Sequence, residues 1–254
     1  MKNKKITKEK ISLDKNSSVP FFIQIAETMK RRILSGKFNP GQQLSAGKEL
    51  EKEFQTSNIT IRKAMEKLKN DGFLEPLRGS GRTVSKVDQE PLGFELSSSF
   101  KKLIKSLEEM KTQVKVLGIT RTTASDYVRN ILSMNAQQEI WQMKRIRIYK
   151  NLPVSFYTYY GDPVQCAAIT EKEAKKSDIL NTVEQAMGIK IHRISNTLRA
   201  FVADLDISSV LEIPFGAPIF FNENTYHTVS GTTVFLSQSY YRGDMFAFRA
   251  TSLL

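Results

Sequence analysis

The sequence predicts an α+β protein of two domains: a small N-terminal domain of three helices and a β-hairpin, and a larger domain built on an antiparallel sheet. Three observations predict this. Apolar residues recur at helical spacing in three segments of the first third, a segment of little periodicity follows at 86–98, and the remaining chain contains an internal repeat. The length of 254 residues is enough for one large domain or two of ordinary size.

The first helix is expected in VPFFIQIAETMKRRILSG, where apolar residues recur at helical spacing between Pro20 and a stop at Gly36. A turn in FNPGQQL precedes a short second helix in SAGKELEKEFQ, with Leu50 and Phe54 on its inner side. Residues 1–17 are rich in lysine and lack an apolar core, so we expect a disordered basic arm there rather than a signal peptide.

The third helix is expected in SNITIRKAMEKLKNDG. Ser57 can cap this helix, because its hydroxyl can accept a hydrogen bond from a free N–H group of the first turn. The apolar stripe with the spacing of a buried helix face consists of Ile61, Ala64, Met65 and Leu68. FLEPLRGSGRTVS then gives two short strands around a hairpin tip, RGSG. Three helices and a hairpin in this order make a winged helix-turn-helix.

The polar start of the third helix suits the major groove of DNA, which is wide enough to admit a helix. Asn58 and Arg62 can make bidentate contacts with base edges, while Ser57 and Thr60 are short donors for phosphate or base. The alternative is a helix whose polar face only meets water. The candidates at the hairpin tip, where two glycines allow close backbone approach, are Arg78, Gly79, Ser80 and Arg82.

The charge distribution favours DNA over the solvated-helix alternative. Residues 1–88 hold 19 lysines and arginines against 10 acidic residues, so they carry +9 of the chain's net +12. A basic surface of this kind favours nucleic acid or an anionic membrane surface as partner. Together with the helix-turn-helix, it predicts binding to double-stranded DNA.

The second domain contains two related halves. ASDYVRNILSMNAQQEIW and ADLDISSVLEIPFGAPIF align at an offset of 79 residues, beginning at Ala124 and Ala203. VSFYTYYGDP and VFLSQSYYRGDM then align at an offset of 81. Each half is expected to form a strand, a short helix and a hairpin, with turns in KNLP at 150–153 and VSGT at 229–232. We therefore expect an antiparallel sheet built from two related halves, with a ligand between them.

Several classes of function are disfavoured. No stretch approaches the roughly 18 apolar residues of a membrane-spanning helix. Cys166 has no second cysteine to pair with, and with only His192 and His227 as histidines no metal site and no cofactor are expected. Cys166, His192 and His227 are also the only candidate nucleophile or imidazole groups for catalysis. They lie in separate segments without paired carboxylates nearby, so an enzyme is disfavoured. We expect a cytoplasmic protein with no membrane partner.

The N-terminal part resembles the GntR family of bacterial transcription regulators in IAETMKRRILSGKFNPGQQL, ELEKEF, SNITIRKAMEKLKNDGFL and GSGRTV. The resemblance implies a homodimer on an inverted-repeat operator. The DNA contacts that it implies lie in the wing around Gly79 and at Lys48, Ser57, Asn58, Thr60 and Arg62.

Two positions depart from the GntR pattern. Ser45, Ala46 and Gly47 stand where the family usually has proline-serine before its second helix. Asn58 stands where the family often has arginine. Asparagine prefers adenine and arginine prefers guanine, so the operator is expected to differ from the family's usual half-site.

The C-terminal part is similar to the UTRA effector domain of the HutC-type branch, in SSSFKKLIKSLEEM, MKRIRIY, LPVSFYTYYGDP, DILNTVEQAMGIKIHR and SQSYYRGDMFAF. This similarity implies a fold like that of chorismate lyase. We place the basic arm at 1–17, the winged helix-turn-helix at 18–86, a linker at 87–98 and the effector domain at 99–254.

The UTRA resemblance also implies an anion site formed by Ser98, Ser99, Arg145 and Arg147. The two arginines lie two apart on an expected strand, so they point to the same face and can clamp a carboxylate or phosphate. The alternative is a solvated sheet face.

We expect Tyr157, Phe235 and Tyr240 to line the remainder of the ligand cleft. Sugar-binding members of the family often have carboxylates at the positions of Tyr157 and Phe235. Two kinds of effector therefore stay equally compatible with the sequence: a phosphorylated sugar or another acidic metabolite, and a ligand that stacks on aromatic rings and carries an acidic group.

These observations predict a ligand-responsive DNA-binding regulator, a repressor that a small anionic metabolite releases from its operator. Two alternatives belong to other classes. The chorismate lyase-like domain could act as an enzyme on a small anionic metabolite, or the fold could serve as a protein-interaction adaptor, against which the basic N-terminal domain argues.

Overall fold

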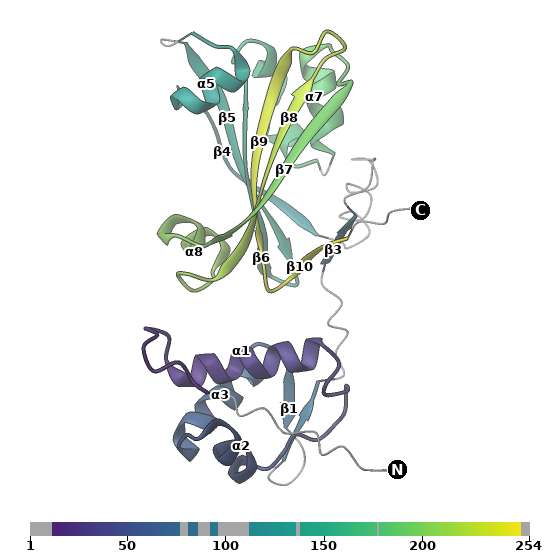
Figure 1. The fold of residues 1–254 in the computed structure, drawn as a ribbon. Coiled ribbons are helices and arrows are strands. Elements are labelled where there is room, and N and C mark those ends of the chain that lie inside the picture. Colours follow the sequence, from purple (N-terminus) through teal and green to yellow (C-terminus); the bar gives the residue numbers. More distant parts are fainter. Residues whose placement is uncertain are drawn as a thin grey trace, which may run out of the picture. The chain divides into compact units, whose positions relative to one another are not determined.

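The structure, a computed structural model, describes residues 12–76, 81–85, 92–95, 112–135, 138–176 and 178–249. The chain divides into two compact units, Met1–Gln89 and Glu90–Leu254. Figure 1 labels the helices and strands of both units.

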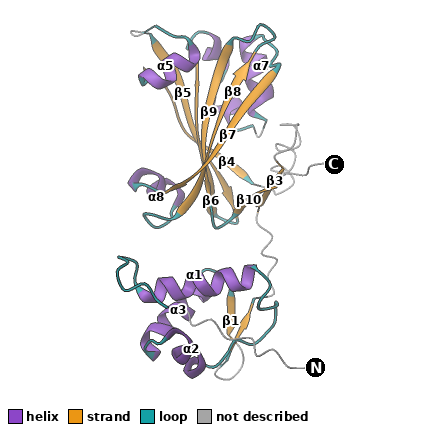
Figure 2. Cartoon of the chain, viewed as in Figure 1, coloured by secondary structure: helices purple, strands orange, loops and turns teal. Residues whose placement is uncertain are grey.

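The N-terminal unit has the predicted order of three helices followed by a hairpin (Figure 2). The helices are α1 (Phe21–Leu34), α2 (Gly47–Phe54) and α3 (Asn58–Asn70). Strands β1 (Leu74–Pro76) and β2 (Arg82–Val84) pair in antiparallel orientation. The predicted winged helix-turn-helix is therefore confirmed.

The core of this unit comes from the predicted apolar faces. Ile61, Ala64, Met65 and Leu68 of α3 are all buried. Arg32 of α1 is also buried, and its Nη2 lies 2.5 Å from Oε1 of Glu53 on α2. Because this guanidinium also lies 5.4 Å from the ring centroid of Phe54, it joins α1 to α2 by charge and by packing.

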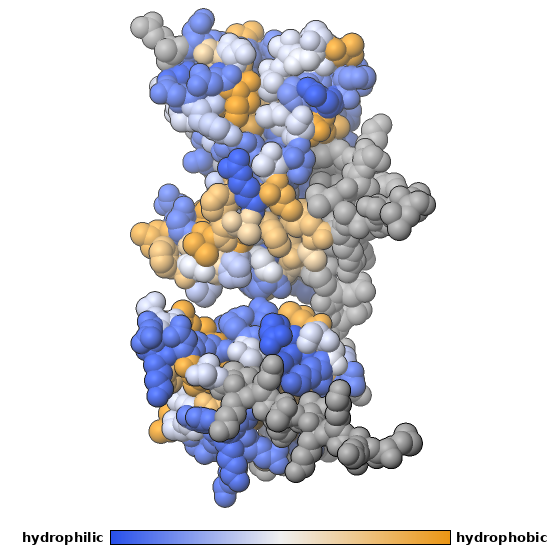
Figure 3. Space-filling view, viewed as in Figure 1, coloured by the Kyte–Doolittle hydropathy of each residue, from blue (hydrophilic) through white to orange (hydrophobic). Residues whose placement is uncertain are grey.

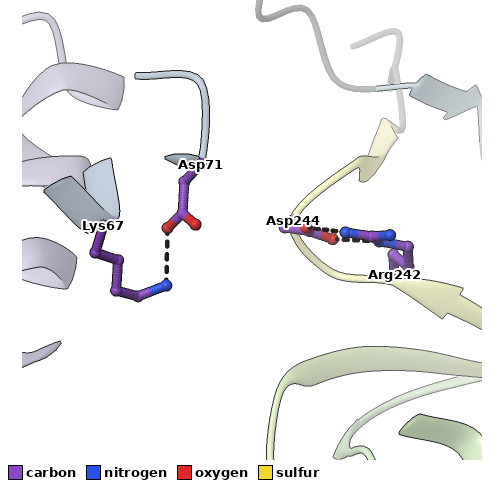
Figure 4. A network of polar contacts seen from close by, with 4 residues as sticks. All are labelled: Lys67, Asp71, Arg242 and Asp244. Carbon is purple, nitrogen blue, oxygen red and sulfur yellow. Dashed lines mark hydrogen bonds and ion pairs between the residues drawn. The ribbon is translucent and has the colours of Figure 1, made fainter. Parts of the chain in front are cut away.

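Both ends of α3 are stabilised by side chains. Ser57 accepts a hydrogen bond from the backbone N–H of Thr60 at 3.4 Å, as the sequence predicts for a cap. Near the other end, Nζ of Lys67 lies 2.9 Å from Oδ2 of Asp71 (Figure 4). The ammonium group in the last turn also interacts favourably with the helix dipole. The cap at Ser57 thus fixes the conformation of the first turn of α3.

The C-terminal unit contains a six-stranded antiparallel sheet of order β4-β5-β6-β9-β8-β7. Each half contributes a strand, a short helix and a hairpin, as predicted. The first half is β4 (Gln113–Thr123), α5 (Asp126–Leu132), β5 (Glu139–Tyr149) and β6 (Leu152–Gly161). The second is β7 (Arg193–Val202), α8 (Leu205–Leu211), β8 (Pro218–His227) and β9 (Thr233–Arg242).

The repeat extends to the helix caps. Ser125 caps α5 by accepting from the N–H of Val128, and Asp204 caps α8 by accepting from the N–H of Ile207. These pairs are separated by the same 79 residues that the aligned sequences show. The sheet order is symmetric about the β6–β9 pair, so the two halves meet along the two central strands.

The two faces of the sheet are covered differently. Between the halves lie η1 (Gln165–Ala168), α6 (Glu171–Ala174) and α7 (Ile179–Met187). Helix α7 packs on one face, here called the α7 face, through Ile179 and Val183. Helices α5 and α8 pack on the other, near opposite ends of the sheet, and this is the α5/α8 face (Figure 1).

The segment predicted as a linker contains a short strand. Leu92–Glu95, within the segment 87–98, forms strand β3 and pairs in parallel with β10 (Phe246–Arg249). The pairing partner lies far along the chain, so local periodicity cannot indicate it. Just before β10, Arg242 and Asp244 form an ion pair of 2.8 Å (Figure 4).

A glycine on β6 provides a test of the packing on the α7 face. A Cβ at Gly161 would lie 2.6 Å from Sγ of Cys166 and 2.9 Å from the ring of Phe235. We expect Gly161→Ala to lower the free energy of unfolding by about 1–3 kcal/mol, measured as the urea midpoint at constant m value. Gly118→Ala on β4 is the matched control, because a Cβ there meets nothing within 4 Å. Equal midpoints for the two variants would contradict this packing.

Candidate functional sites

The start of α3 presents the polar surface that the sequence predicts. Asn58 and Arg62 are exposed, and the neighbouring Ile59 is 68% exposed. Nδ2 of Asn58 donates a hydrogen bond to Oε1 of Glu51 on α2, at 2.6 Å. The carboxylate therefore orients this amide at the point where the helix starts, a contact that sequence reasoning missed.

The other predicted DNA-contacting residues of this unit lie on separate elements. Lys48 is exposed on α2, and Arg82 is partly exposed on β2 at the base of the hairpin. Ser57 and Thr60 both belong to the cap of α3, with their hydroxyl oxygens 3.0 Å apart. Arg78, Gly79 and Ser80 lie outside the described residues.

The predicted arginine pair lies on the α7 face. Arg145 and Arg147 sit on β5 opposite Tyr157 and Ser155 of β6. Each guanidinium-bearing residue is only 2% exposed. The solvated-face alternative is therefore wrong, and the two side chains share one face, as the strand period requires.

Arg145 makes all its described hydrogen bonds to neutral oxygens. Its Nε and Nη2 donate to the hydroxyl of Tyr159 at 3.1 and 2.8 Å. Its Nη1 donates to the backbone carbonyls of Ala174 and Lys176 at 3.0 and 2.9 Å. Its guanidinium carbon also lies 4.9 Å from the ring centroid of Tyr159 and 5.7 Å from that of Tyr157.

The phenols around this arginine do not neutralise its charge. Burial raises the pKa of Tyr159 above its ordinary value, even though the nearby Arg145 opposes the shift. Burial likewise raises the pKa of Tyr226 and Tyr241 on the same face. These groups stay protonated at neutral pH, so Arg145 is a buried cation surrounded by dipoles and aromatic rings.

Arg147 contacts the start of the sheet. Its Nη1 donates to the hydroxyl of Thr112 at 2.9 Å. Thr112 directly precedes β4, so this contact ties the residue before the first strand to the C-terminal part of the next strand, β5. The predicted partners Ser98 and Ser99 lie outside the described residues.

Buried hydroxyl and amide side chains continue from the arginines across the α7 face. Each is at most 4% exposed, and cross-strand register links them from β6 through β9 to β8. Asn224 donates to Ser237 at 3.3 Å, and Asn196 of β7 bridges to Asn222 and Asn224 at 2.8 and 2.7 Å. The members of this polar row are Ser155, Ser237, Ser239, Asn222 and Asn224.

The predicted aromatic residues divide between the two faces. Tyr157 and Phe235 lie on the α7 face, where the rings of Tyr157 and Tyr159 stack with centroids 5.9 Å apart. The expectation that Tyr240 lines the same cleft is wrong. Tyr240 packs with Phe156 on the α5/α8 face, because adjacent residues of a strand point to opposite sides.

Sequence reasoning missed Tyr159, Thr112 and the polar row. The sequence held a signal for part of the row. Every second residue of one expected strand, namely Phe235, Ser237, Ser239 and Tyr241, points to the same face, so the two serines had to lie on the face of Phe235. The contact of Arg145 with Ala174 and Lys176 joins distant segments through backbone atoms, which no side-chain pattern encodes.

The described residues offer neither a metal cluster nor a membrane-spanning helix. Within the described segments, no three or more histidine, cysteine, aspartate or glutamate residues come together as a metal site would require. None of the helices that the structure describes is long and apolar enough to cross a bilayer.

Comparison with known proteins assigns the two units. Residues 23–84 match the gntR family of bacterial regulatory proteins, and residues 107–247, more than half of the chain, match the UTRA domain. The chain is a GntR-family regulator with a UTRA domain. GntR-family regulators of this type bind DNA operators through the first unit and effector metabolites through the UTRA domain.

Curated relatives of this GntR–UTRA regulator are transcriptional repressors. It is 26% identical to the repressor NagR of Bacillus subtilis over 94% of this chain and 97% of that protein. It is 25% identical to MngR of Escherichia coli, the repressor of a mannosyl-D-glycerate transport and metabolism system, over 90% of this chain and 94% of that one. The chain is accordingly a transcription regulator and not an enzyme.

Solved structures share the fold of the GntR–UTRA regulator. YydK of Bacillus subtilis has a TM-score of 0.56 at 20% identity, over 92% of this chain and all of that one. PhnF of Mycobacterium smegmatis has a TM-score of 0.58 at 17% identity, over 90% of this chain and 99% of that one. At these identities the likeness concerns the fold alone.

Arg62 offers a test of the DNA-reading helix. We expect Arg62→Ala to weaken binding to a duplex selected from a random pool by roughly 1–3 kcal/mol, the value of one lost bidentate contact. Lys69→Ala is the matched control, because Lys69 is an exposed cation near the far end of the same helix. Fluorescence anisotropy at fixed salt measures both. Equal losses would mean that α3 contributes charge and no base contacts through Arg62.

Proposed function

We propose that the chain is a ligand-responsive repressor that binds an inverted-repeat operator as a homodimer and releases it when a small anionic metabolite binds the α7 face. The observation that carries the effector part is the burial of Arg145 among neutral partners. A buried cation without an anionic partner is costly, and a carboxylate or phosphate on this face would compensate it.

The polar row supports a hydroxylated effector. Each Ser or Asn side chain of the row can both donate and accept, as sugar hydroxyls require of their partners. Buried polar side chains are also less favourable for stability than apolar ones of similar size, so function is the better reason for their presence. The system that the relative MngR represses handles mannosyl-D-glycerate, a sugar that carries a carboxylate. We infer a phosphorylated sugar or a comparable acidic metabolite for this chain.

Aromatic rings next to the arginines provide the rest of the proposed site. Tyr157 lies opposite Arg145 on the α7 face, and Phe235 lies further along that face with its ring against Tyr159; both rings could stack against the ligand body. Ser98 and Ser99 remain proposed contacts to the acidic group, on the basis of the UTRA resemblance. Tyr240 is not part of this proposal, because it faces the other side of the sheet.

Exposed apolar side chains support self-association of the C-terminal unit. In the described part of the chain, β7 is an edge strand that pairs only with β8. Figure 3 shows apolar side chains gathered on the surface near α8, and the exposed ones there are Phe201, Val202, Leu205 and Phe215. A second copy suits this surface, because a two-fold operator needs two recognition helices. A monomer mass in sedimentation velocity would contradict this.

DNA binding is proposed to follow the recognition-helix geometry of the family. Arg62 and Asn58 would read base edges, while Lys48, Ser57, Thr60 and the hairpin residues from Arg78 to Arg82 would contact phosphates or bases. Because Glu51 holds the amide of Asn58, the orientation of this side chain is set before DNA arrives. An asparagine so placed favours adenine at its position in each half-site.

Removal of both arginines tests the effector site. Sugar phosphates and hydroxy acids are screened by thermal shift at constant ionic strength, where a ligand at 100 times its Kd stabilises by about 2.7 kcal/mol. We expect a hit to stabilise the wild type and release a selected operator, and to do neither with Arg145→Ala/Arg147→Ala. The control double variant is Lys115→Ala/Lys144→Ala.

The control removes the same charge from exposed side chains that point away from the α7 face, since Lys115 and Lys144 are paired in register with Ile146 and Thr158. A normal effector response in the double arginine variant would place the site elsewhere. Loss of the response in both double variants would point to a general effect of charge.

A further inference from the structure

The two arginines of the α7 face each hold a different segment against the sheet. Arg145 holds the connection between α6 and α7 through the carbonyls of Ala174 and Lys176. Arg147 holds Thr112, the residue that precedes β4. Both contacts end on oxygen atoms, which are also what a carboxylate or phosphate would offer to a guanidinium.

The segment held by Arg145 positions a whole helix. It leads directly into α7, whose Ile179 and Val183 pack against the α7 face. Its own backbone is ordered by hydrogen bonds from the N–H groups of Lys175 and Lys176 to the carbonyls of Glu171 and Glu173. A change at the guanidinium of Arg145 therefore reaches the helix that covers the sheet.

The residue held by Arg147 lies where the chain enters the sheet. Thr112 directly precedes β4, so the covalent chain coming from the DNA-binding unit reaches the six-stranded sheet at this residue. Releasing the hydroxyl of Thr112 removes one contact that holds this residue against β5. The two arginines thus join the anion site to both the covering helix and the incoming chain.

We propose that these protein oxygens compete with the effector anion for the two guanidinium groups, so that effector binding releases the 174–176 segment and Thr112 from the sheet. The inference rests on the proposed effector site. It gives that site a mode of control: the effector favours an arrangement in which the arginines have exchanged the protein's own acceptors for the anion.

The energetics favour this exchange. The hydrogen bonds of Arg145 to the carbonyls are charged on the donor side only, whereas those to a carboxylate or phosphate are charged on both sides and can form as a bidentate pair, so they are stronger. The carbonyls of Ala174 and Lys176 are neutral, and the hydroxyl of Tyr159 stays protonated because burial raises its pKa. The ligand thereby has different affinities for the two arrangements, which is what control of an equilibrium requires.

Hydrogen exchange of the full-length protein tests the release, with inorganic phosphate as the probe and potassium chloride at equal ionic strength as the reference. We expect amide exchange in peptides covering 174–182 to become roughly tenfold faster with phosphate, the equivalent of one or two weakened hydrogen bonds. Peptides from α5, on the opposite face, should not change.

Two variants make the test specific. In Arg145→Lys the positive charge remains but the paired carbonyl contacts do not, so 174–182 should exchange fast without phosphate and show no further increase. In Thr112→Val one competing acceptor is removed while size is kept, so phosphate affinity should rise about threefold to tenfold. A fall in affinity would mean that Thr112 serves the anion and does not compete with it.

The remaining outcomes separate this inference from the proposed function. If Arg145→Lys and Arg147→Lys weaken phosphate binding but phosphate leaves exchange at 174–182 unchanged or slower, the arginines bind the anion without release, and the competition is wrong. If phosphate binds equally to wild type and both lysine variants, or not at all, the anion site itself is wrong and the competition falls with it.

Discussion

The buried guanidinium of Arg145 is the constraint on which the arrangement of the C-terminal unit depends. It lies on β5, the second strand from one edge of the sheet, at 2% exposure, and it is surrounded by two carbonyls, a phenol and two aromatic rings. Such a cation is tolerated only where every donor has an acceptor. The acceptors come from β6 and from the connection into α7, so satisfying one charge fixes both the sheet face and the helix that covers it.

The internal repeat explains how a site of this kind is built. Two copies of a strand, a helix and a hairpin meet along β6 and β9, and their helices take one face of the sheet. The other face is left for residues that differ between the halves: the arginines come from the first half and the asparagines of the polar row from the second, while both halves contribute tyrosines and serines. Symmetry of the backbone thus produces a face whose two sides differ in chemistry, one cationic and one neutral and polar.

Much of this was predictable from the sequence. The 79-residue offset predicted the order of elements, and the helical spacing in 57–72 predicted both the cap at Ser57 and the buried stripe of α3. The position of Tyr240 was also within reach, because Phe235 and Tyr240 are an odd number of residues apart and an uninterrupted strand puts them on opposite faces. That parity was overlooked in favour of aromatic character.

Other features depend on contacts that no local pattern carries. Strand β3 pairs with β10 across most of the C-terminal unit's sequence, so its residues look like a linker. The carbonyls that hold Arg145 could belong to any residues, because every residue has one. The hydrogen bond between Glu51 and Asn58 depends on the angle between α2 and α3. That angle is set by the turn at Gln55, whose φ is positive at 50°.

The central claim is that Arg145 and Arg147 are buried in order to bind an anion. NMR of the full-length protein labelled with nitrogen-15 arginine tests it most directly, with the side-chain Nε–Hε signals of both residues assigned through the Arg145→Lys and Arg147→Lys variants. During titration with inorganic phosphate at constant ionic strength, the account predicts that these two signals shift together and saturate, while those of exposed arginines such as Arg193 and Arg199 do not. Shifts confined to the exposed arginines, or linear shifts without saturation, would contradict it.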